Sequence, residues 1–319
     1  MKIVVLDGHT LNPGDLSWSG IAQQGDLTVY ERTLPEDTLA RLEGAEIVFT
    51  NKTPLRRDHF AAHPQLRFVG VLATGYNVVD IAAAKARGIQ VCNIPTYGTM
   101  AVAQFATALM LELCHRVGRH ADSVQAGYWS HGNDFCYWLN PQVELDGKTL
   151  GIVGFGRIGQ AFGRIAQALG MKILAVDDFP NKALESDTLR YTTLDDLYVN
   201  ADVISLHCPL FDNNTGMIDT VAIAKMKPGV LILNTSRGPL INEADLAAAL
   251  KSGRVAGAGL DVLSCEPPTL DNPLVSAPNC IVTPHIAWAT KEARSRLMDI
   301  AVDNLAAFLQ GAPKNVVNP

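Results

Sequence analysis

The feature that most constrains the fold of this chain is a glycine array set between two apolar runs. The array has the pattern G-x-G-x-x-G and is formed by Gly154, Gly156 and Gly159. It follows the apolar run 149–153 and opens a segment of helical periodicity that ends at Gly170. The next apolar run, 172–176, leads directly into Asp177. This order of strand, turn, helix, strand and acidic residue is the full context that a dinucleotide-binding βαβ unit requires.

Each part of the array has a physical role in holding a dinucleotide. The first glycine allows the tight turn, the second lets a pyrophosphate approach the backbone, and the third lets the helix pack closely on the strand. The helix N-terminus offers unpaired N–H groups and the positive end of the helix dipole. Asp177 can accept hydrogen bonds from ribose hydroxyls, and with Asp178 it would repel a 2′-phosphate, although the nearby Lys182 keeps NADP open. The sequence therefore favours NAD over NADP.

Short apolar runs alternate with helical patterns along the rest of the chain, which is typical of α/β folds with parallel sheets. The expected strands cover 2–7, 27–31, 47–50, 68–72 and 90–93 in a first series, and 149–153, 172–176, 203–206, 230–234, 257–262 and 280–283 in a second. A long helix is expected over 99–124, with Val117 on its buried face, and a loop over 127–146. A last helix is expected over 291–309. The sequence predicts two doubly wound α/β units.

Composition and charge exclude several classes of protein. The 319 residues are 48% hydrophobic with a formal charge of −6, which suits two buried cores and disfavours nucleic acid as a partner. No apolar run reaches the roughly 18 residues of a membrane helix, and the N-terminus is expected to be a strand rather than a leader. The six scattered cysteines indicate reduced thiols in a cytoplasmic protein. His59 and His63 lack the Glu of H-E-x-x-H, and Pro64 disrupts a helix there, so no metal site is predicted.

Three residues suited to acid–base and anion chemistry follow different strands of the second series: Arg237, Glu266 and His285. Ligands of an open parallel sheet bind beyond the carboxyl ends of its strands. A guanidinium can bind the paired oxygens of a 2-oxo acid, and an imidazolium can protonate the carbonyl oxygen as hydride arrives. A neighbouring carboxylate favours the charged imidazole and orients it. Each residue alone has an ordinary alternative: an ion pair, a solvated carboxylate or a buried histidine. Together, beyond a dinucleotide unit, they predict hydride transfer to a 2-oxo acid.

Several motifs in order resemble those of the D-isomer-specific 2-hydroxyacid dehydrogenase family. They are GFGRIG, Asp177, NTSRG, the run from Asp261 to Pro267, and TPHIAWAT, and the resemblance covers nearly the whole chain. It implies a Rossmann-type cofactor domain inserted into a flavodoxin-like substrate domain, to which the last helix returns. Residues 1–99 plus 290–319 would then bind the substrate, and 100–289 would bind NAD. It also implies that Arg237, Glu266 and His285 are catalytic.

The resemblance implies a set of ligand contacts as well. Cofactor contacts beyond the three glycines would be Arg157, Ile158, Asp177, Cys208, Pro209, Thr235, Ser236 and, through the nicotinamide carboxamide, Asp261. Backbone N–H groups of Ala73, Thr74 and Gly75 would hold the substrate carboxylate, with Arg237 as a second substrate contact. A small-residue turn at a strand end can form such an anion-binding nest, and a plain strand-to-helix turn is the alternative. Cys208 and Cys265 are more simply read as small packing residues.

Within the family, the stretches VLATGYNVVD, YGTMAVAQ and TPHIAWATKEAR are most similar to glycerate dehydrogenases, also called hydroxypyruvate reductases. We therefore expect NADH-dependent reduction of hydroxypyruvate to D-glycerate, possible activity on glyoxylate, and the reverse oxidation. A phosphoglycerate dehydrogenase-like enzyme and a non-enzymatic NAD-sensing protein of the corepressor type remain open. Formate dehydrogenase is disfavoured, because it pairs its histidine with Gln where this chain has Glu266.

The resemblance also implies a homodimer that pairs through the cofactor domains. The helix beginning at Thr99 and the loop after it would form the contact between the two copies. Trp138, in this loop, would either reach the active site of the partner or pack against its own chain.

Overall fold

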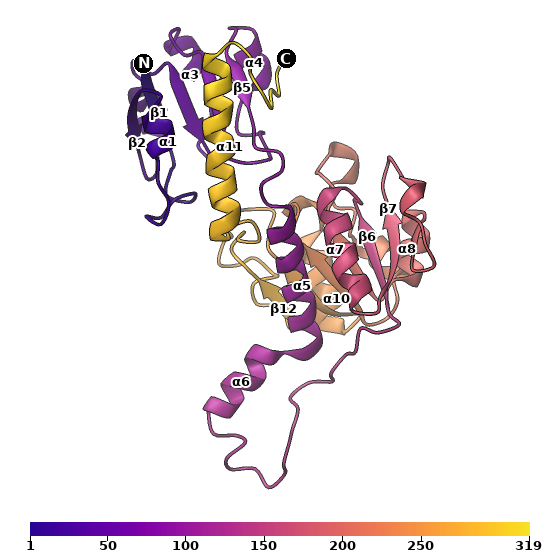
Figure 1. The fold of residues 1–319 in the computed structure, drawn as a ribbon. Coiled ribbons are helices and arrows are strands. Elements are labelled where there is room, and N and C mark those ends of the chain that lie inside the picture. Colours follow the sequence, from indigo (N-terminus) through magenta and orange to yellow (C-terminus); the bar gives the residue numbers. More distant parts are fainter. The chain divides into compact units, whose positions relative to one another are not determined.

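The computed structural model describes residues 1–319, which form two units, each built on its own parallel sheet (Figure 1). Unit 1 comprises Met1–Gly98 and Trp288–Pro319, and unit 2 comprises Thr99–Ala287. The chain therefore leaves unit 1 once, after Gly98, and returns to it once, at Trp288.

Unit 1 has a five-stranded sheet in the order β2-β1-β3-β4-β5, with every neighbouring pair parallel. Its strands are β1 (Lys2–Val5), β2 (Asp26–Val29), β3 (Ile47–Thr50), β4 (Phe68–Val71) and β5 (Gln90–Cys92). Its helices are α1 (Ser19–Ala22), the short η1 (Pro35–Asp37), α2 (Thr38–Arg41), α3 (Arg57–Ala62), α4 (Ile81–Lys85) and α11 (Lys291–Leu309). This strand order is that of flavodoxin-like folds. Strands β3 and β4 are buried at every position, which explains their uninterrupted apolar sequences.

The last helix, α11, packs against β4 and α1 and so belongs to unit 1 (Figure 1). Thr290 caps its N-terminus, because its side chain accepts a hydrogen bond from the Ala293 N–H at 3.2 Å. Phe308, near its end, packs against Phe68 of β4 with ring centroids 4.9 Å apart and the rings tilted by 42°. The final helix therefore completes the core of a sheet whose strands lie some 200 residues earlier in the chain.

Unit 2 has a seven-stranded parallel sheet in the order β12-β11-β10-β9-β6-β7-β8. Its strands are β6 (Thr149–Val153), β7 (Lys172–Val176), β8 (Leu189–Tyr191), β9 (Val203–Leu206), β10 (Val230–Asn234), β11 (Val255–Leu260) and β12 (Cys280–Val282). Its helices are α5 (Thr99–His115), α6 (Val117–Gln125), α7 (Arg157–Ala168), η2 (Lys182–Leu184), α8 (Leu194–Asn200), η3 (Asp212–Asn214), α9 (Thr220–Lys225), η4 (Gly238–Leu240) and α10 (Glu243–Ser252). This is a Rossmann-type order, and the direction of winding reverses between β6 and β9. The expected α/β fold class is confirmed.

The sequence predicted one long helix where the structure has two. Helices α5 and α6 are separated at Arg116, whose φ of 51° lies in the left-handed region. Val117, expected on the buried face, is 64% exposed because it follows this break. Left-handed backbone is rare outside glycine and asparagine, so nothing in the sequence marked the position. Strand β8 was also missed, since three residues with Arg190 in the middle show no strand period.

Residues 117–146, called the arm below, contain α6 and then no helix or strand before β6. In Figure 1 the arm extends away from the sheet of unit 2. It carries exposed apolar side chains, namely Val117, Val124, Tyr128, Trp129, Phe135, Trp138 and Leu139. Trp138 is 68% exposed.

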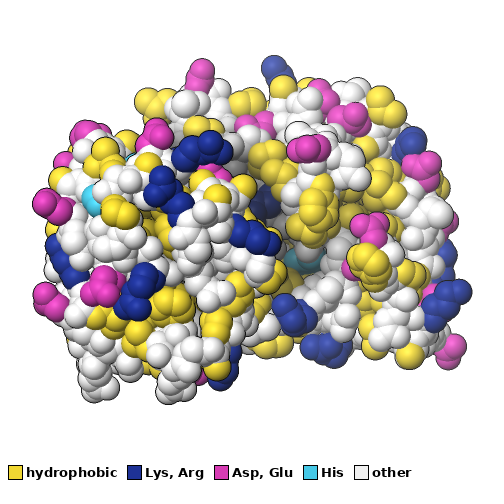
Figure 2. Space-filling model, turned by 90° about the horizontal axis from the view of Figure 1, so that it is seen from above, with side chains coloured by type: hydrophobic (Ala, Val, Ile, Leu, Met, Phe, Trp, Pro, Cys, Tyr) yellow, Lys and Arg dark blue, Asp and Glu magenta, His cyan; other side chains and the backbone are white.

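None of the helices combines the length and the hydropathy that crossing a bilayer requires. All six cysteines are free thiols, and no three metal-ligating side chains gather in one place. On the face drawn in Figure 2, basic side chains (dark blue) and acidic side chains (magenta) are both scattered among uncharged ones.

Candidate active site

The glycine turn lies at the switch point of the unit 2 sheet, between β6 and β9. Gly154 has a φ of +90°, and a Cβ on it would lie 2.4 Å from the backbone nitrogen of Cys208, just after β9. A Cβ on Gly159 would lie 2.3 Å from the Gly154 carbonyl oxygen, so α7 packs tightly on the turn. A Cβ on Gly156 would meet no atom within 4 Å. The turn therefore leaves open space beside the N-terminus of α7, where a pyrophosphate would be held by helix N–H groups.

Asp177, directly after β7, is tied to this turn. One carboxylate oxygen accepts the N–H of Phe155 at 2.7 Å, and the other accepts the N–H of Phe179 at 2.9 Å. The carboxylate is thereby held in one orientation and keeps acceptor capacity for ribose hydroxyls. Arg157 and Ile158, two further expected cofactor contacts, form the first turn of α7.

The turn after β10 presents further polar groups beside the switch point. Asn234, fully buried, accepts the Ser236 N–H at 3.0 Å and donates to the Arg237 carbonyl at 2.8 Å. Ser236 Oγ in turn donates to the Cys208 carbonyl at 2.5 Å. Thr235 Oγ1 is buried without any hydrogen-bond partner in the chain. A buried hydroxyl without a hydrogen-bond partner costs free energy, so Thr235 Oγ1 indicates that a ligand group forms a hydrogen bond here. The residues at this switch point fit NAD as that ligand.

Two titratable groups at the switch point are uncharged at neutral pH. Burial lowers the pKa of His207 to about 4, and its Nε2 lies 2.8 Å from Ser205 Oγ. Burial raises the pKa of the Cys208 thiol to about 11, so this sulfur is protonated and unreactive, in line with a packing role. Pro209, the next expected cofactor contact, is exposed.

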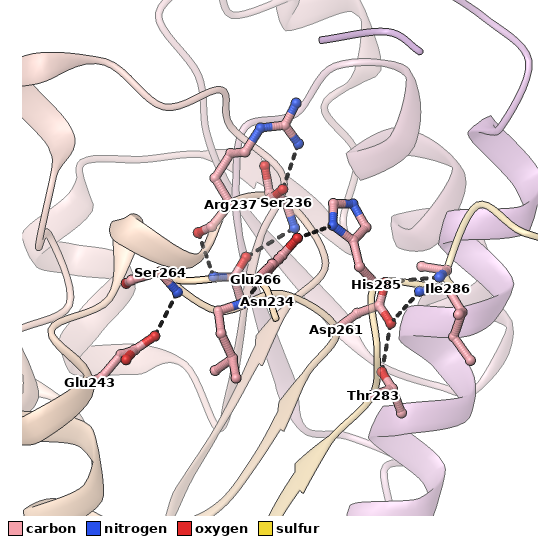
Figure 3. A network of polar contacts seen from close by, with 12 residues as sticks. Asn234, Ser236, Arg237, Glu243, Asp261, Ser264, Glu266, Thr283, His285 and Ile286 are labelled. Carbon is pink, nitrogen blue, oxygen red and sulfur yellow. Dashed lines mark hydrogen bonds and ion pairs between the residues drawn. The ribbon is translucent and has the colours of Figure 1, made fainter. Parts of the chain in front are cut away.

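Glu266 and His285 are brought together from two different loops (Figure 3). His285 Nδ1 and Glu266 Oε2 are 2.6 Å apart, and the two side chains are 27% and 34% exposed. The other oxygen of Glu266 accepts the Leu263 N–H at 3.1 Å. Because Nδ1 faces the carboxylate, proton exchange between His285 and a ligand would use Nε2.

Asp261 shapes the backbone around His285, in addition to any contact with a cofactor. Its oxygens accept the Thr283 hydroxyl at 2.6 Å and the N–H groups of Ile286 and Ala287 at 2.9 and 2.8 Å (Figure 3). His285 itself has a φ of 54°, in the left-handed region. Burial raises the pKa of the Asp261 carboxyl above its usual value, and these hydrogen bonds oppose that shift. Of the roughly four acceptor positions of a carboxylate, one remains for a carboxamide.

Arg237 lies in a loop that touches the loop of Glu266. A Cβ on Gly238 would lie 1.9 Å from the carbonyl carbon of Leu263, so the two backbones are in direct contact. The half-buried guanidinium donates to the Ser236 carbonyl at 2.7 Å and makes no ion pair within the chain. The structure therefore pairs two of the three expected catalytic residues, and the third, Arg237, lies in the adjoining loop.

The expected substrate turn of unit 1 follows β4. The Ala73 carbonyl accepts the Ile94 N–H, Thr74 Oγ1 donates to the Ile94 carbonyl, and Asn93 donates to the Thr74 carbonyl. These bonds fix the carbonyl side of the turn against the segment after β5. The backbone N–H groups of Ala73, Thr74 and Gly75 make no hydrogen bond within the chain.

Two carboxylates hold the loop after β3 and the loop that carries Glu266. No sequence pattern marks them, and the sequence analysis did not predict their roles. Asp7, buried after β1, accepts the backbone N–H groups of Asn51, Lys52 and Thr53 and so fixes the loop after β3. Glu243 similarly holds the loop that carries Glu266.

The chain is similar to several known dehydrogenases and reductases. A family model described as "D-isomer specific 2-hydroxyacid dehydrogenase, NAD binding domain" matches residues 107–287, more than half of the chain. A hydroxypyruvate reductase of Blautia hydrogenotrophica is 60% identical over 100% of both chains. A glycerate dehydrogenase of Methylorubrum extorquens is 45% identical over 99% of this chain and 98% of its own.

A solved structure extends the likeness to three dimensions. The D-lactate dehydrogenase of Aquifex aeolicus, complexed with NAD and lactic acid, is 28% identical with a TM-score of 0.86, covering 100% of this chain and 99% of that one. The expected family, fold and NAD cofactor are thereby confirmed. The chain belongs to the D-isomer specific 2-hydroxyacid dehydrogenase family.

Proposed function

We propose that this protein reduces hydroxypyruvate to D-glycerate with NADH, accepts glyoxylate as a second substrate, and catalyses the reverse oxidation. The observation that carries the proposal is the 2.6 Å contact of Glu266 with His285, in the same unit as the dinucleotide turn. The choice of oxo acid is supported by the hydroxypyruvate reductase that is 60% identical over the full length. A D-3-phosphoglycerate dehydrogenase of Archaeoglobus fulgidus is only 36% identical, over 85% of this chain.

Arg237, His285 and Glu266 each have one task in this reaction. NADH, when bound, supplies the hydride that reaches the carbonyl carbon of the substrate. Arg237 binds the carboxylate and carbonyl oxygens of the oxo acid through its planar guanidinium. His285 donates a proton from Nε2 to the carbonyl oxygen, on which negative charge develops. Glu266 orients the ring and stabilises its charged form.

We assign the substrate carboxylate to the turn formed by Ala73, Thr74 and Gly75. Its three backbone N–H groups have no acceptor within the chain, and adjacent N–H groups of this kind bind anions. Unit 1 accordingly contributes to substrate binding, and unit 2 binds NAD and supplies Arg237. The cofactor is NAD rather than NADP, because Asp177 and Asp178 would repel a 2′-phosphate.

We also propose that the protein is a cytoplasmic homodimer that contacts neither nucleic acid nor membrane. The exposed apolar side chains of the arm would be covered by a second copy of the chain. Six unpaired cysteines suit a reducing compartment, and the net charge of −6 does not favour nucleic acid.

Turnover of a substrate panel, followed at the NADH absorbance, tests the proposal. We expect the highest kcat/KM for hydroxypyruvate with NADH, a lower one for glyoxylate, and poor use of NADPH. In His285→Asn the kcat should fall at least about 100-fold with NADH binding retained, since general acid catalysis contributes that much. Preference for 3-phosphohydroxypyruvate would assign the protein to phosphoglycerate metabolism instead. Tight NADH binding without any turnover would identify a sensing protein.

A further inference from the structure

One carboxylate outside the proposed active site holds the segment that carries Glu266. Glu243 lies in the first turn of α10, after the N-cap Asn242. Its Oε1 accepts the backbone N–H of Ser264 at 2.7 Å, and its Oε2 accepts the side-chain amide of Asn272 at 2.8 Å (Figure 3 shows the first contact). The two contacts lie at the two ends of residues 264–271, so a single carboxylate closes this segment into a loop.

The closed segment has little structure of its own. All eight residues from 264 to 271 are exposed, and none lies in a helix or a strand. Its hydrogen bonds to the surrounding chain include those of Glu243, that of the Thr269 carbonyl with the Asn272 N–H, and those of Glu266 with the Leu263 N–H and His285. A segment with so few buried contacts is easily displaced unless its ends are held.

The far end of the segment is a firm anchor for Glu243. Asn272 is only 8% exposed, and its side-chain oxygen accepts the N–H of Leu274, which lies in the core at 1% exposure. This bond fixes the amide, so that the NH₂ group faces Glu243. At the near end, Leu263 is held by its backbone contact with Gly238. Glu243 therefore links two fixed points, between which Glu266 protrudes.

We propose that Glu243 is a positioning residue of the reaction: by holding both ends of residues 264–271, it keeps Glu266 in contact with His285. This inference rests on the proposed function, in which Glu266 orients and charges the proton donor. Glu243 itself touches neither Glu266 nor His285; it acts through the Ser264 backbone and the Asn272 amide. A displacement of about 1 Å at a reacting group can cost 100-fold in rate, so a loosened loop is expected to be measurable.

The test is a charge-preserving exchange between the two side chains. In Glu243→Gln, either orientation of the new amide loses one of the two contacts, because an NH₂ group then faces an N–H donor. Asn272→Asp alone places two carboxylates where a 2.8 Å hydrogen bond was. In the double variant, the glutamine NH₂ donates to the aspartate and the net charge equals that of the native chain. We expect kcat for hydroxypyruvate to fall about tenfold in each single variant and to recover to within about threefold in the double variant. The KM for NADH should change by less than about twofold throughout.

A matched control comes from the same turn of α10. Asp245 accepts the Thr220 N–H at 2.9 Å but does not touch residues 264–271. Asp245→Asn removes the same charge from the first turn of α10 and should leave kcat unchanged. Hydrogen exchange gives a readout besides activity. The backbone amides of residues 263–272 should exchange faster in Glu243→Gln and in Asn272→Asp than in the native chain. In the double variant they should return to native rates.

The outcomes separate this inference from the proposed function. Single variants with native kcat, or a double variant that stays as slow as the singles, would overturn the positioning role of Glu243. An equal loss of kcat in Asp245→Asn would do so too, since the effect would then be one of helix stability. If the native chain does not reduce hydroxypyruvate at all, the proposed function fails, while the exchange rates still report whether Glu243 holds the loop.

Discussion

At the scale of single residues, the glycines of the dinucleotide turn differ in what an added methyl group would meet. Gly156→Ala places it in open space, so we expect folding stability to change by less than about 0.5 kcal/mol while NADH affinity falls at least about tenfold. Gly154→Ala adds left-handed strain and a clash with Cys208, and should cost about 2 kcal/mol or more of stability. Thermal unfolding and NADH titration measure the two effects. A Gly156→Ala variant that binds NADH normally would show that the pyrophosphate does not approach here.

A second single residue, His207, links stability to pH. Its pKa is about 4 in the folded chain because of burial, against an ordinary value of 6.5. The unfolded chain therefore takes up a proton near pH 6.5 and the folded chain only near pH 4, so stability is full above pH 6.5 and is lost as the pH falls between these values. The loss should reach at most about 3 kcal/mol. His207→Gln, which cannot titrate, should lose correspondingly less between pH 7 and pH 4.5 in chemical unfolding. Parallel losses in the two proteins would refute the assignment.

The candidate catalytic residues could be predicted from the sequence because each follows a strand, and strand ends of a parallel sheet converge. Arg237, Glu266 and His285 were found in this way. Glu243 could not be, because its partners are a backbone N–H 21 residues away and an amide 29 residues away. An acidic residue in the first turn of a helix is common for reasons of the helix dipole alone. Asp7 was missed for the same reason, since its partners are backbone groups more than 40 residues away.

At the scale of elements, the strands buried on both faces were the most predictable part of the fold. Runs such as 47–50 and 203–206 are apolar because helices cover both sides of a parallel sheet. Short edge strands lack this signal, as β8 shows with its exposed Arg190. The break between α5 and α6 could not be predicted from the sequence, for a different reason. It falls on an arginine in left-handed backbone, where local preferences favour a continuous helix.

The attachment of α11 to unit 1 gives a prediction at this scale. Arg294, 8% exposed, donates to the carbonyls of Leu11 and Ala289 and to both oxygens of Asp15. Arg294→Met should lower the stability of unit 1 by about 1 to 3 kcal/mol, because the buried Leu11 carbonyl loses its hydrogen-bond donor. Calorimetry should show an unfolding transition shifted to lower temperature.

Two further measurements sharpen this prediction. The Arg294 guanidinium lowers the pKa of the Asp15 carboxyl, so in the native chain this pairing is complete above the ordinary carboxyl pKa and is lost in acid. The native chain should therefore be more sensitive to acid than the variant. NADH affinity, which belongs to unit 2, should not change, and a variant with native stability would contradict the role given to Arg294.

At the scale of the whole molecule, one architecture is used twice. Both sheets are parallel and doubly wound, and in both a buried carboxylate after a strand fixes the neighbouring loop through backbone N–H groups. Asp7 does this in unit 1 and Asp261 in unit 2. Each unit thus presents preformed loops at the carboxyl edge of its sheet, which is where ligands of such sheets bind.

The arm gives the last prediction, which concerns assembly. Phe135 and Trp138 are 90% and 68% exposed, so replacing them by Asp should not affect folding of a single chain. If a second copy covers the arm, the same replacements place charges in an apolar interface and should separate the copies. We expect light scattering to give twice 34.3 kDa for the native chain and 34.3 kDa for Phe135→Asp/Trp138→Asp.

The control for assembly is Val221→Asp. Val221 lies on α9, outside the arm, and is 66% exposed. The Val221→Asp variant should remain a dimer. A native monomer, or a dimer that survives both changes in the arm, would exclude the arm as the interface. Activity adds a second conclusion. A separated chain with native kcat would show that Trp138 does not act in the active site of a partner, whereas a loss of kcat is expected if it does.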